Sequence, residues 1–175
     1  MPDATGLELI AQGVREKLGD ESVVGTHYVD GYATLEVAPA SIREVLTHLR
    51  DGGGDFFERV MSVHANDYYP EEPRFGIHYE LLSMERLDRL HVKLRVRDGE
   101  TVPTIVDLFP TADFQEREVY DMFGVTFDGH PDPRRILMPE DYEGFPQRRD
   151  FPMGGEPILF THNEPTTPGW WDRDE

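Results

Sequence analysis

The stretch from residue 114 to 137, FQEREVYDMFGVTFDGHPDPRRIL, concentrates side chains that can do chemistry. Carboxylates, a histidine and arginines this close together could form a catalytic site, a metal site or a docking surface. The spacing of these residues can distinguish among a catalytic site, a metal site and a docking surface. The charged and titratable residues to be placed are Glu116, Arg117, Glu118, Asp121, His130, Arg134 and Arg135.

A metal site is one interpretation of this stretch. Glu118 and Asp121, three residues apart on a helix, together with His130 would supply oxygen and nitrogen ligands. The stretch has no HExxH pattern, no second histidine and no repeated Glu-x-x-His pair. The chain also has no GxGxxG, Walker lysine or GxSxG motif. A free-standing carboxylate and histidine metal-dependent enzyme is therefore an incomplete alternative, which stays open.

The plainer interpretation is an amphipathic helix with a solvated charged face. On a helical wheel, Val119, Met122 and Phe123 fall on one side and the charged residues spread over the other. Asp113, with Glu116 three residues later, predicts a capping pair at the start of this helix. Gly124 predicts its end.

The elements that must position this helix lie upstream. Apolar spacing predicts a first helix over 6–18, and Ser41 with Glu44 predicts a capping box that opens a second one. Asp30-Gly31 predicts a hairpin turn. The β-favouring runs are 22–28, 32–37, 56–66, 76–83 and 90–96.

This order, α-β-β-α-β-β-β, predicts a two-layer α+β domain over residues 1–100, with two helices on one face of a five-stranded mixed sheet. The second helix should bury one apolar stripe, formed by Ile42, Val45, Leu46 and Leu49. On the last strand, Val92, Leu94 and Val96 should face the core. Four histidines fall on the predicted strands, which favours structural, hydrogen-bonded roles for them: His27, His64, His78 and His91.

Two further segments follow residue 100. Residues 101–137 are predicted to be a helical segment with a docking turn, including a short helix over 104–109. Residues 138–175 are rich in proline, which predicts an extended tail that can lie along a partner. Its aromatic anchors would be Tyr142, Phe145, Phe151, Phe160, Trp170 and Trp171.

Composition excludes several classes of function. The formal net charge of −18 argues against binding to nucleic acid or to an anionic membrane surface. With no cysteine, the chain has no thiolate for an iron–sulfur cluster or a cysteine-based zinc site. The sequence shows no signal peptide and no apolar run of about 20 residues, so we expect a soluble chain that reaches a membrane only through partners.

The stretch resembles the signature of one protein family. Glu116-Arg117-Glu118, then Asp121, Met122-Phe123, His130, Arg134 and Ile136 occur at the fixed gaps of the 30 kDa subunit family of respiratory complex I (NADH:quinone oxidoreductase, NDH-1). The flanks DLFPTADF and QRRDFP also follow in family-like order. Pro133 departs from the leucine of many relatives, and Gln147 stands where a small or apolar residue is frequent. Neither departure breaks a signature position.

The resemblance implies a peripheral-arm subunit of proton-translocating NADH:quinone oxidoreductase. Such a subunit holds no cofactor and has no catalytic residue of its own, while flavin mononucleotide (FMN), iron–sulfur clusters and quinone are held by partner subunits. It docks chiefly on the large quinone-site subunit, at the cytoplasmic face of the cell membrane. The signature residues would then be interface residues: Glu116, Arg117, Glu118, Asp121, Met122, Phe123, His130, Arg134, Arg135 and Ile136. The equivalent subunit of a ferredoxin- or F420-dependent dehydrogenase or of a membrane-bound hydrogenase fits the same resemblance.

Overall fold

The computed structural model describes residues 2–52 and 57–152. Within these residues, two helices and five strands are followed by a smaller unit of two strands and one helix. Short 3₁₀ turns at Asp20–Ser22 and Pro39–Ser41 lead into the first strand and the second helix. The elements are α1 (Ala4–Leu18), β1 (Val23–Val29), β2 (Tyr32–Val37), α2 (Ile42–Asp51), β3 (Arg59–Asp67), β4 (Phe75–Ser83), β5 (Asp88–Val96), β6 (Thr101–Pro103), α3 (Ala112–Phe123) and β7 (Thr126–Asp128).

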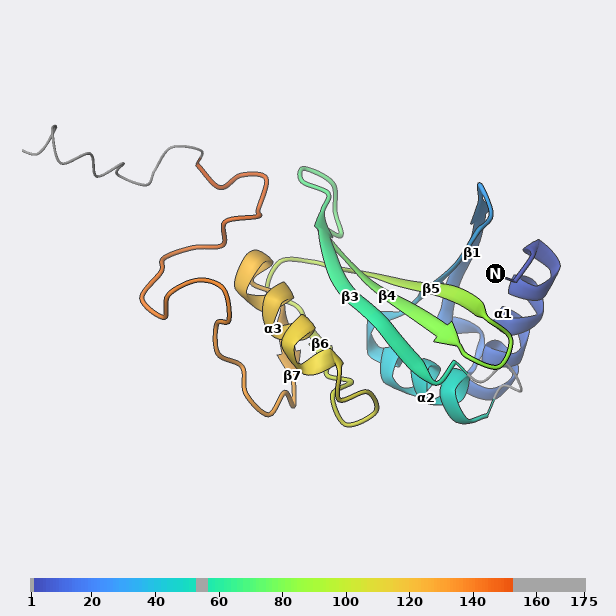
Figure 1. The fold of residues 1–175 in the computed structure, drawn as a ribbon. Coiled ribbons are helices and arrows are strands. Elements are labelled where there is room, and N and C mark those ends of the chain that lie inside the picture. The colour runs from blue at the N-terminus through green and yellow to red at the C-terminus, as the bar shows by residue number, and fades with distance from the viewer. Residues whose placement is uncertain (1, 53–56, 153–175) are drawn as a thin grey trace, which may run out of the picture.

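The first five strands form one mixed sheet in the order β1-β2-β5-β4-β3. β2 and β5 run parallel at its centre, and the other neighbours are antiparallel. α1 and α2 cover one face of the sheet, whereas α3 lies beside β3 at one edge (Figure 1). The predicted α+β architecture, with two helices on a five-stranded mixed sheet, is confirmed.

The core lies between the sheet and its two helices. The predicted stripe of α2 is fully buried, and so are Val92, Leu94 and Val96 on β5. The hairpin of β1 and β2 turns at Asp30 and Gly31, whose φ angles of 52° and 85° are the two positive values that a type I′ turn requires. These local patterns therefore specify the core and the turn as the sequence predicts.

The opposite face of the sheet carries a row of histidines. The rings of His64, His78 and His91 stack across three neighbouring strands, with centroids 5.1 Å and 4.9 Å apart. His78 Nδ1 lies 2.8 Å from His91 Nε2. Burial, and then the neighbouring imidazoles, lower the pKa of His78 to about 3. His78 is therefore neutral at physiological pH, consistent with the structural role expected for these histidines.

The predicted capping box of α2 does not form. Ser41 does precede the helix, but its side chain makes no capping hydrogen bond. A capping residue normally has an extended backbone, whereas Ser41 has φ −95° and ψ 0° because the 3₁₀ turn at Pro39–Ser41 runs straight into α2.

The predicted helix over 104–109 is also wrong. The chain there leaves β6 and makes a single turn, closed by hydrogen bonds from the N–H groups of Leu108 and Phe109 to Ile105 O. At the start of this turn, Thr104 N–H donates to the backbone oxygen of Asp128, the last residue of β7. β6 and β7 pair as a parallel ribbon, which the sequence analysis did not predict.

Residues 130–152 have neither helix nor strand and follow an irregular path beside α3 (Figure 1). In the described part of the chain, no helix is long and apolar enough to cross a membrane. Three of the predicted tail anchors, Phe160, Trp170 and Trp171, lie outside the described residues.

Candidate functional site

The signature residues are positioned by α3, which packs against β3. Its buried side faces the core, and Gln115 Oε1 accepts a hydrogen bond of 2.5 Å from Val63 N–H on the outer edge of β3. α3 therefore protects this edge of the sheet as well as filling the core beside it. The buried apolar residues of α3 are Ala112, Val119, Met122 and Phe123.

Gly124 ends α3 at a position that only glycine fits. Its φ is 77°, in the left-handed region. A Cβ on this residue would lie 2.5 Å from the ring of Phe145 and 2.7 Å from the guanidinium of Arg148. The helix end and the later segment 145–148 are therefore packed directly on each other.

Asp121 holds the chain that follows the signature turn. The side chain is fully buried, and its Oδ2 accepts the backbone N–H groups of Ile136, Leu137 and Met138 at 3.0, 2.7 and 2.8 Å. Its Oδ1 accepts from Arg135 Nη1 at 2.7 Å. Burial alone would raise the pKa of Asp121, but these four donors outweigh burial and lower the pKa. Asp121 is therefore an ionised anchor for the backbone after α3.

Arg117 holds the same turn from the neighbouring position. Its Nε donates to Arg134 O at 3.0 Å and its Nη2 to Arg135 O at 3.1 Å. Its Nη1 also lies 3.3 Å from Asp132 Oδ2. The i,i+4 neighbours Arg117 and Asp121 thus each bind the loop over 132–138.

His130 is buried inside this turn. Asp132 N–H donates to His130 Nδ1 at 3.0 Å, which places the proton of the neutral ring on Nε2. Nε2 then faces Asp113, 3.3 Å from the backbone oxygen and 3.6 Å from the carboxylate. This imidazole therefore bridges the turn to the first residues of α3.

Glu116 is also fully buried and links α3 to the loop after β6. Its Oε2 accepts from the Thr104 hydroxyl at 2.5 Å and its Oε1 from Ile105 N–H at 2.9 Å. Burial, with a smaller contribution from the carboxylates of Asp113 and Asp107, raises the pKa of Glu116 to about 7, although the two hydrogen bonds lower it in part. Glu116 therefore keeps its proton to a higher pH than an exposed glutamate does.

The predicted capping pair of Asp113 and Glu116 is therefore wrong. Thr111 takes the N-cap position, and no side chain caps the helix there. The expectation of a solvated charged face is wrong for the same reason, because Glu116 and Asp121 point into the protein. Both carboxylates instead bind groups that lie 11 or more residues away along the chain.

The raised pKa of Glu116 predicts a pH-dependent stability. Between about pH 4.5 and 7 the folded state binds a proton that the unfolded state releases, so the contribution of Glu116 to stability is lost as pH rises through this window. The loss amounts to about 3 kcal/mol. Urea unfolding should therefore show Glu116→Gln to be more stable than the wild type at pH 8 and equal to it near pH 4.5.

Glu118→Gln is the matched control for this prediction. Glu118 lies on the same helix and is exposed, so its replacement should leave the pH profile unchanged. The stability difference between Glu116→Gln and the wild type should depend on pH. If it were the same at pH 8 and pH 4.5, the raised pKa of Glu116 would be contradicted.

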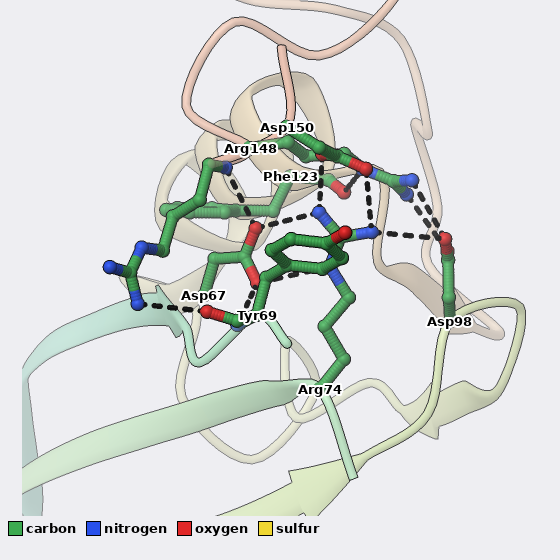
Figure 2. Close-up of polar contacts among 8 residues, drawn as sticks. Asp67, Tyr69, Arg74, Asp98, Phe123, Arg148 and Asp150 are labelled. Atoms are coloured by element: carbon green, nitrogen blue, oxygen red, sulfur yellow. Dashed lines mark hydrogen bonds and ion pairs between the residues drawn. The ribbon is translucent and has the colours of Figure 1, made fainter. Parts of the chain in front are cut away.

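A second network fastens residues 148–150 to the sheet (Figure 2). Arg74, just before β4, is buried, and it binds Asp67 through Nε at 3.0 Å and Nη2 at 2.7 Å. The same guanidinium binds Asp150 at 2.5 and 3.1 Å. Arg148 binds Asp98 at 2.8 and 2.9 Å. The extended segment is therefore held by paired charges at the β3–β4 and β5–β6 connections.

Burial and hydrogen bonding compete at the centre of this network. Burial raises the pKa of Asp67, but Arg74 and the N–H groups of Arg149 and Tyr69 outweigh burial and lower the pKa to about 2. The guanidinium of Arg74 also lies 4.9 Å from the centre of the Phe75 ring. The network is thus ionic on one side and packed against an aromatic ring on the other.

Three of the predicted tail anchors pack within the chain. Tyr142 and Phe151 stack on each other with ring centroids 6.3 Å apart. Phe145 lies edge-on to Tyr120 of α3 and beneath the guanidinium of Arg148, 4.7 Å away. These contacts fold residues 142–151 back on α3 and on one another.

A few signature-region side chains remain exposed on α3 and the following loop. Phe114, Leu137 and the side chain of Arg134 are each more than half exposed. The guanidinium of Arg134 donates to the neighbouring Asp132 at 2.6 and 2.8 Å. We call the exposed set the α3 surface: Phe114, Glu118, Arg134 and Leu137.

The arrangement offers little for metal chemistry. Both oxygens of Asp121 already accept hydrogen bonds from N–H donors. Asp121 is therefore not free to bind a metal together with Glu118 and His130. Over residues 2–52 and 57–152, no group of three or more acidic, histidine or cysteine side chains is placed to hold a metal ion.

Comparison with known proteins places this geometry in a family. A model of the respiratory-chain NADH dehydrogenase 30 kDa subunit matches residues 35–157, from the second strand of the sheet past the network of Arg74. The chain belongs to this 30 kDa subunit family. The resemblance inferred from the signature residues is confirmed.

Curated relatives extend the match. The NADH-quinone oxidoreductase C subunit of Saccharopolyspora erythraea is 47% identical over 143 residues, covering 80% of this chain and 57% of the relative. The protein of the same name from Herpetosiphon aurantiacus is 41% identical over 155 residues, covering 88% and 86%. That of Roseiflexus castenholzii is 39% identical over 145 residues, covering 82% and 83%. The chain thus spans little more than half of the first relative and most of the other two.

In this member of the 30 kDa subunit family, the structure brings Glu116, Asp121, His130 and Arg135 into one internally paired unit with the loop. Sequence reasoning missed their partners, above all Thr104, and the whole network of Arg74. The only feature of the sequence that indicated this network was the QRRDFP motif. Its charged residues pair with residues far away in the sequence; Asp150, for example, binds Arg74, which lies 76 residues earlier.

Proposed function

We propose that this chain is the 30 kDa subunit of a proton-translocating NADH:quinone oxidoreductase and acts as a structural subunit of its peripheral arm. The observation that carries the proposal is the family match over 35–157, because it covers most of the sheet and the signature helix. The names of the curated relatives support the same assignment. The buried pairing of Glu116 and Asp121 supports a role in shape, since carboxylates held this way are not available to a substrate.

We further propose that FMN, the iron–sulfur clusters and quinone are held by partner subunits. Thiolates are the usual ligands of iron–sulfur clusters, and this chain has no cysteine. Its contribution to electron transfer is then to hold neighbouring subunits in place. Membrane contact is made through the complex, at the cytoplasmic face.

The large quinone-site subunit is the proposed main partner, and the α3 surface is the proposed contact. An aromatic ring and an arginine are the residue types that dominate interface energies. Phe114 and Arg134 both have exposed side chains. The guanidinium of Arg117 lies 5.9 Å from the ring of Phe114 and donates to the backbone oxygen of Arg134. Because Arg117 is hydrogen-bonded to the turn, the backbone that carries Phe114 and Arg134 is held in place.

This proposal predicts a separation between assembly and folding. In tagged full-length chain purified from cells, Phe114→Ser combined with Arg134→Glu should reduce the recovery of partner subunits at least tenfold. The isolated variant should keep its free energy of unfolding within about 0.5 kcal/mol of the wild type, because both side chains are exposed. Arg135 is unsuitable for this test, since it binds the buried Asp121.

Leu9→Ser is the matched control. Leu9 is as exposed as Phe114 but lies on α1, at the other end of the sheet (Figure 1). Its replacement should leave partner recovery unchanged. Equal recovery for the double variant and the control would refute the α3 surface as a docking element.

A further inference from the structure

The two edges of the main sheet differ in how they are protected. β3 is covered by α3, and Gln115 occupies an outward N–H of that strand at Val63. At the other edge, β1 pairs only with β2 among the described elements. An unpaired strand edge is a template for another strand, and proteins usually block it with lysine, proline or a covering element. Neither β1 nor β2 contains lysine or proline.

The backbone of β1 is regular enough to take another strand. Its register with β2 shifts once, between Val23 and Gly25, and is then unbroken from Gly25 to Val29, where Val29 faces Tyr32 across the two-residue turn. The bulge is confined to the start of the strand and leaves the remaining five residues regular. The pair beside such a turn exchanges both hydrogen bonds, and bonded pairs alternate along the strand. The amides of Thr26 and Tyr28 therefore point away from β2, toward the open edge.

Apolar side chains gather around this edge. Val24, Val29 and Tyr32 are each more than 60% exposed, and Tyr28 is 44% exposed. Val29 and Tyr32 are cross-strand partners on one face of the hairpin, and Tyr28 lies on the other face. Exposed aromatic and β-branched residues along an unpaired edge are typical of strand addition between proteins.

The surrounding charge selects the occupant. From residue 18 to 42 the chain has no lysine or arginine, and acidic residues lie at both ends of β1: Asp20 and Glu21 before it and Asp30 after it. A second copy of β1 in antiparallel pairing would bring these acidic ends together, which disfavours self-association. The chain's own residues 153–175 contain five acidic residues and one arginine, so they are repelled as well.

We propose that the outer edge of β1 binds an extended segment of a partner protein as a sixth strand, one in which apolar residues alternate with lysine or arginine. Its main-chain groups pair with Thr26 and Tyr28, its apolar side chains cover Val29 and Tyr32, and its cations face Asp20, Glu21 and Asp30. The inference rests on the proposed function only in that the partner belongs to the same assembly. The site is distinct from the α3 surface, because β1 and β3 are the opposite edges of the sheet.

Amide hydrogen exchange of the isolated full-length chain and of the purified assembly tests the inference. In the isolated chain, the amides of Thr26 and Tyr28 should exchange fast while those of His27 and Val29 are protected. In the assembly, Thr26 and Tyr28 should slow by on the order of 100-fold. Fast exchange at both in an intact assembly would overturn the sixth strand but leave the proposed function standing. If the chain purifies without partners, both proposals fail.

A paired substitution adds the chemical test. Val29→Lys introduces a cation at the edge and should reduce retention of the strand-donating partner at least tenfold, without destabilising the isolated chain. Leu87→Lys, at an exposed position in the β4–β5 turn, should have no effect. Retention that is the same in both variants would contradict a basic occupant.

Discussion

Replacing Asp121 with alanine is expected to lower the free energy of unfolding by about 3–5 kcal/mol, the cost of leaving a buried charge and its donors without their partner. The variant loses the acceptor for the three amides of residues 136–138 and for Arg135. Because whole domains are stable by only about 5–15 kcal/mol, this is a large fraction. Urea unfolding measures the loss, and amide exchange at 136–138 should speed up more than exchange in β4 and β5.

Two companion variants make the Asp121 prediction specific. Asp121→Asn keeps an oxygen for the amides but sets an NH₂ group against Arg135, so a smaller loss of about 1–3 kcal/mol is expected. Glu118→Ala, an exposed carboxylate on the same helix, should change stability by no more than about 0.5 kcal/mol. If Asp121→Ala cost no more than Glu118→Ala, the anchoring role would be disproved.

Replacing Arg74 with alanine should be comparably severe, at about 3–5 kcal/mol. It leaves Asp67, whose side chain is 1% exposed, without its cation, and it frees Asp150 (Figure 2). The segment 148–150 should then open more often, because Arg148 and Arg149 still hold it to the sheet but Asp150 no longer does. Trypsin, which cleaves after arginine, should cut at Arg148 and Arg149 much faster than in the wild type.

Other substitutions separate the network from a general loss of charge. Asp150→Asn, at a side chain 44% exposed, should cost about 1 kcal/mol or less, and Arg89→Ala, at an exposed position of β5, should cost nothing measurable. Acid provides an independent check. The lowered pKa of Asp67 means that its share of stability, about 2 kcal/mol, is present above pH 4 and is lost as pH falls toward 2. Unchanged tryptic cleavage in Arg74→Ala would contradict the network.

The regular part of the fold is predictable because its signals are local. The alternation on β5, the stripe of α2 and Asp30-Gly31 each specify an element within a few residues, and the structure confirms them. The helix predicted over 104–109 is reduced to a single turn, and Thr104 and Ile105 at its start bond to Asp128 of β7 and to Glu116 of α3. No local pattern contains those partners.

The site shows the same division more sharply. The spacing of the signature residues identified the family. A helical wheel, however, assigns Glu116 and Asp121 to the solvent side, because it uses only the local sequence and contains no information on distant partners. The structure places both carboxylates inside and leaves Phe114 and Arg134 outside. The interface roles predicted for the signature residues remain predictions. Pairings such as Arg74 with Asp150 join residues that are far apart in the sequence, so they cannot be predicted from local patterns in a single sequence.

The internal pairing of the signature charges has a functional consequence. These charges hold the segment after α3 in place, and the exposed groups of the α3 surface, with the open edge of β1, are the surfaces that we propose for partners. The direct test is purification of the native assembly through a tag on this chain in mild detergent. We expect one-to-one co-migration with subunits that carry flavin and iron–sulfur clusters. A chain that migrates without them, while remaining folded, would contradict the structural role proposed for it.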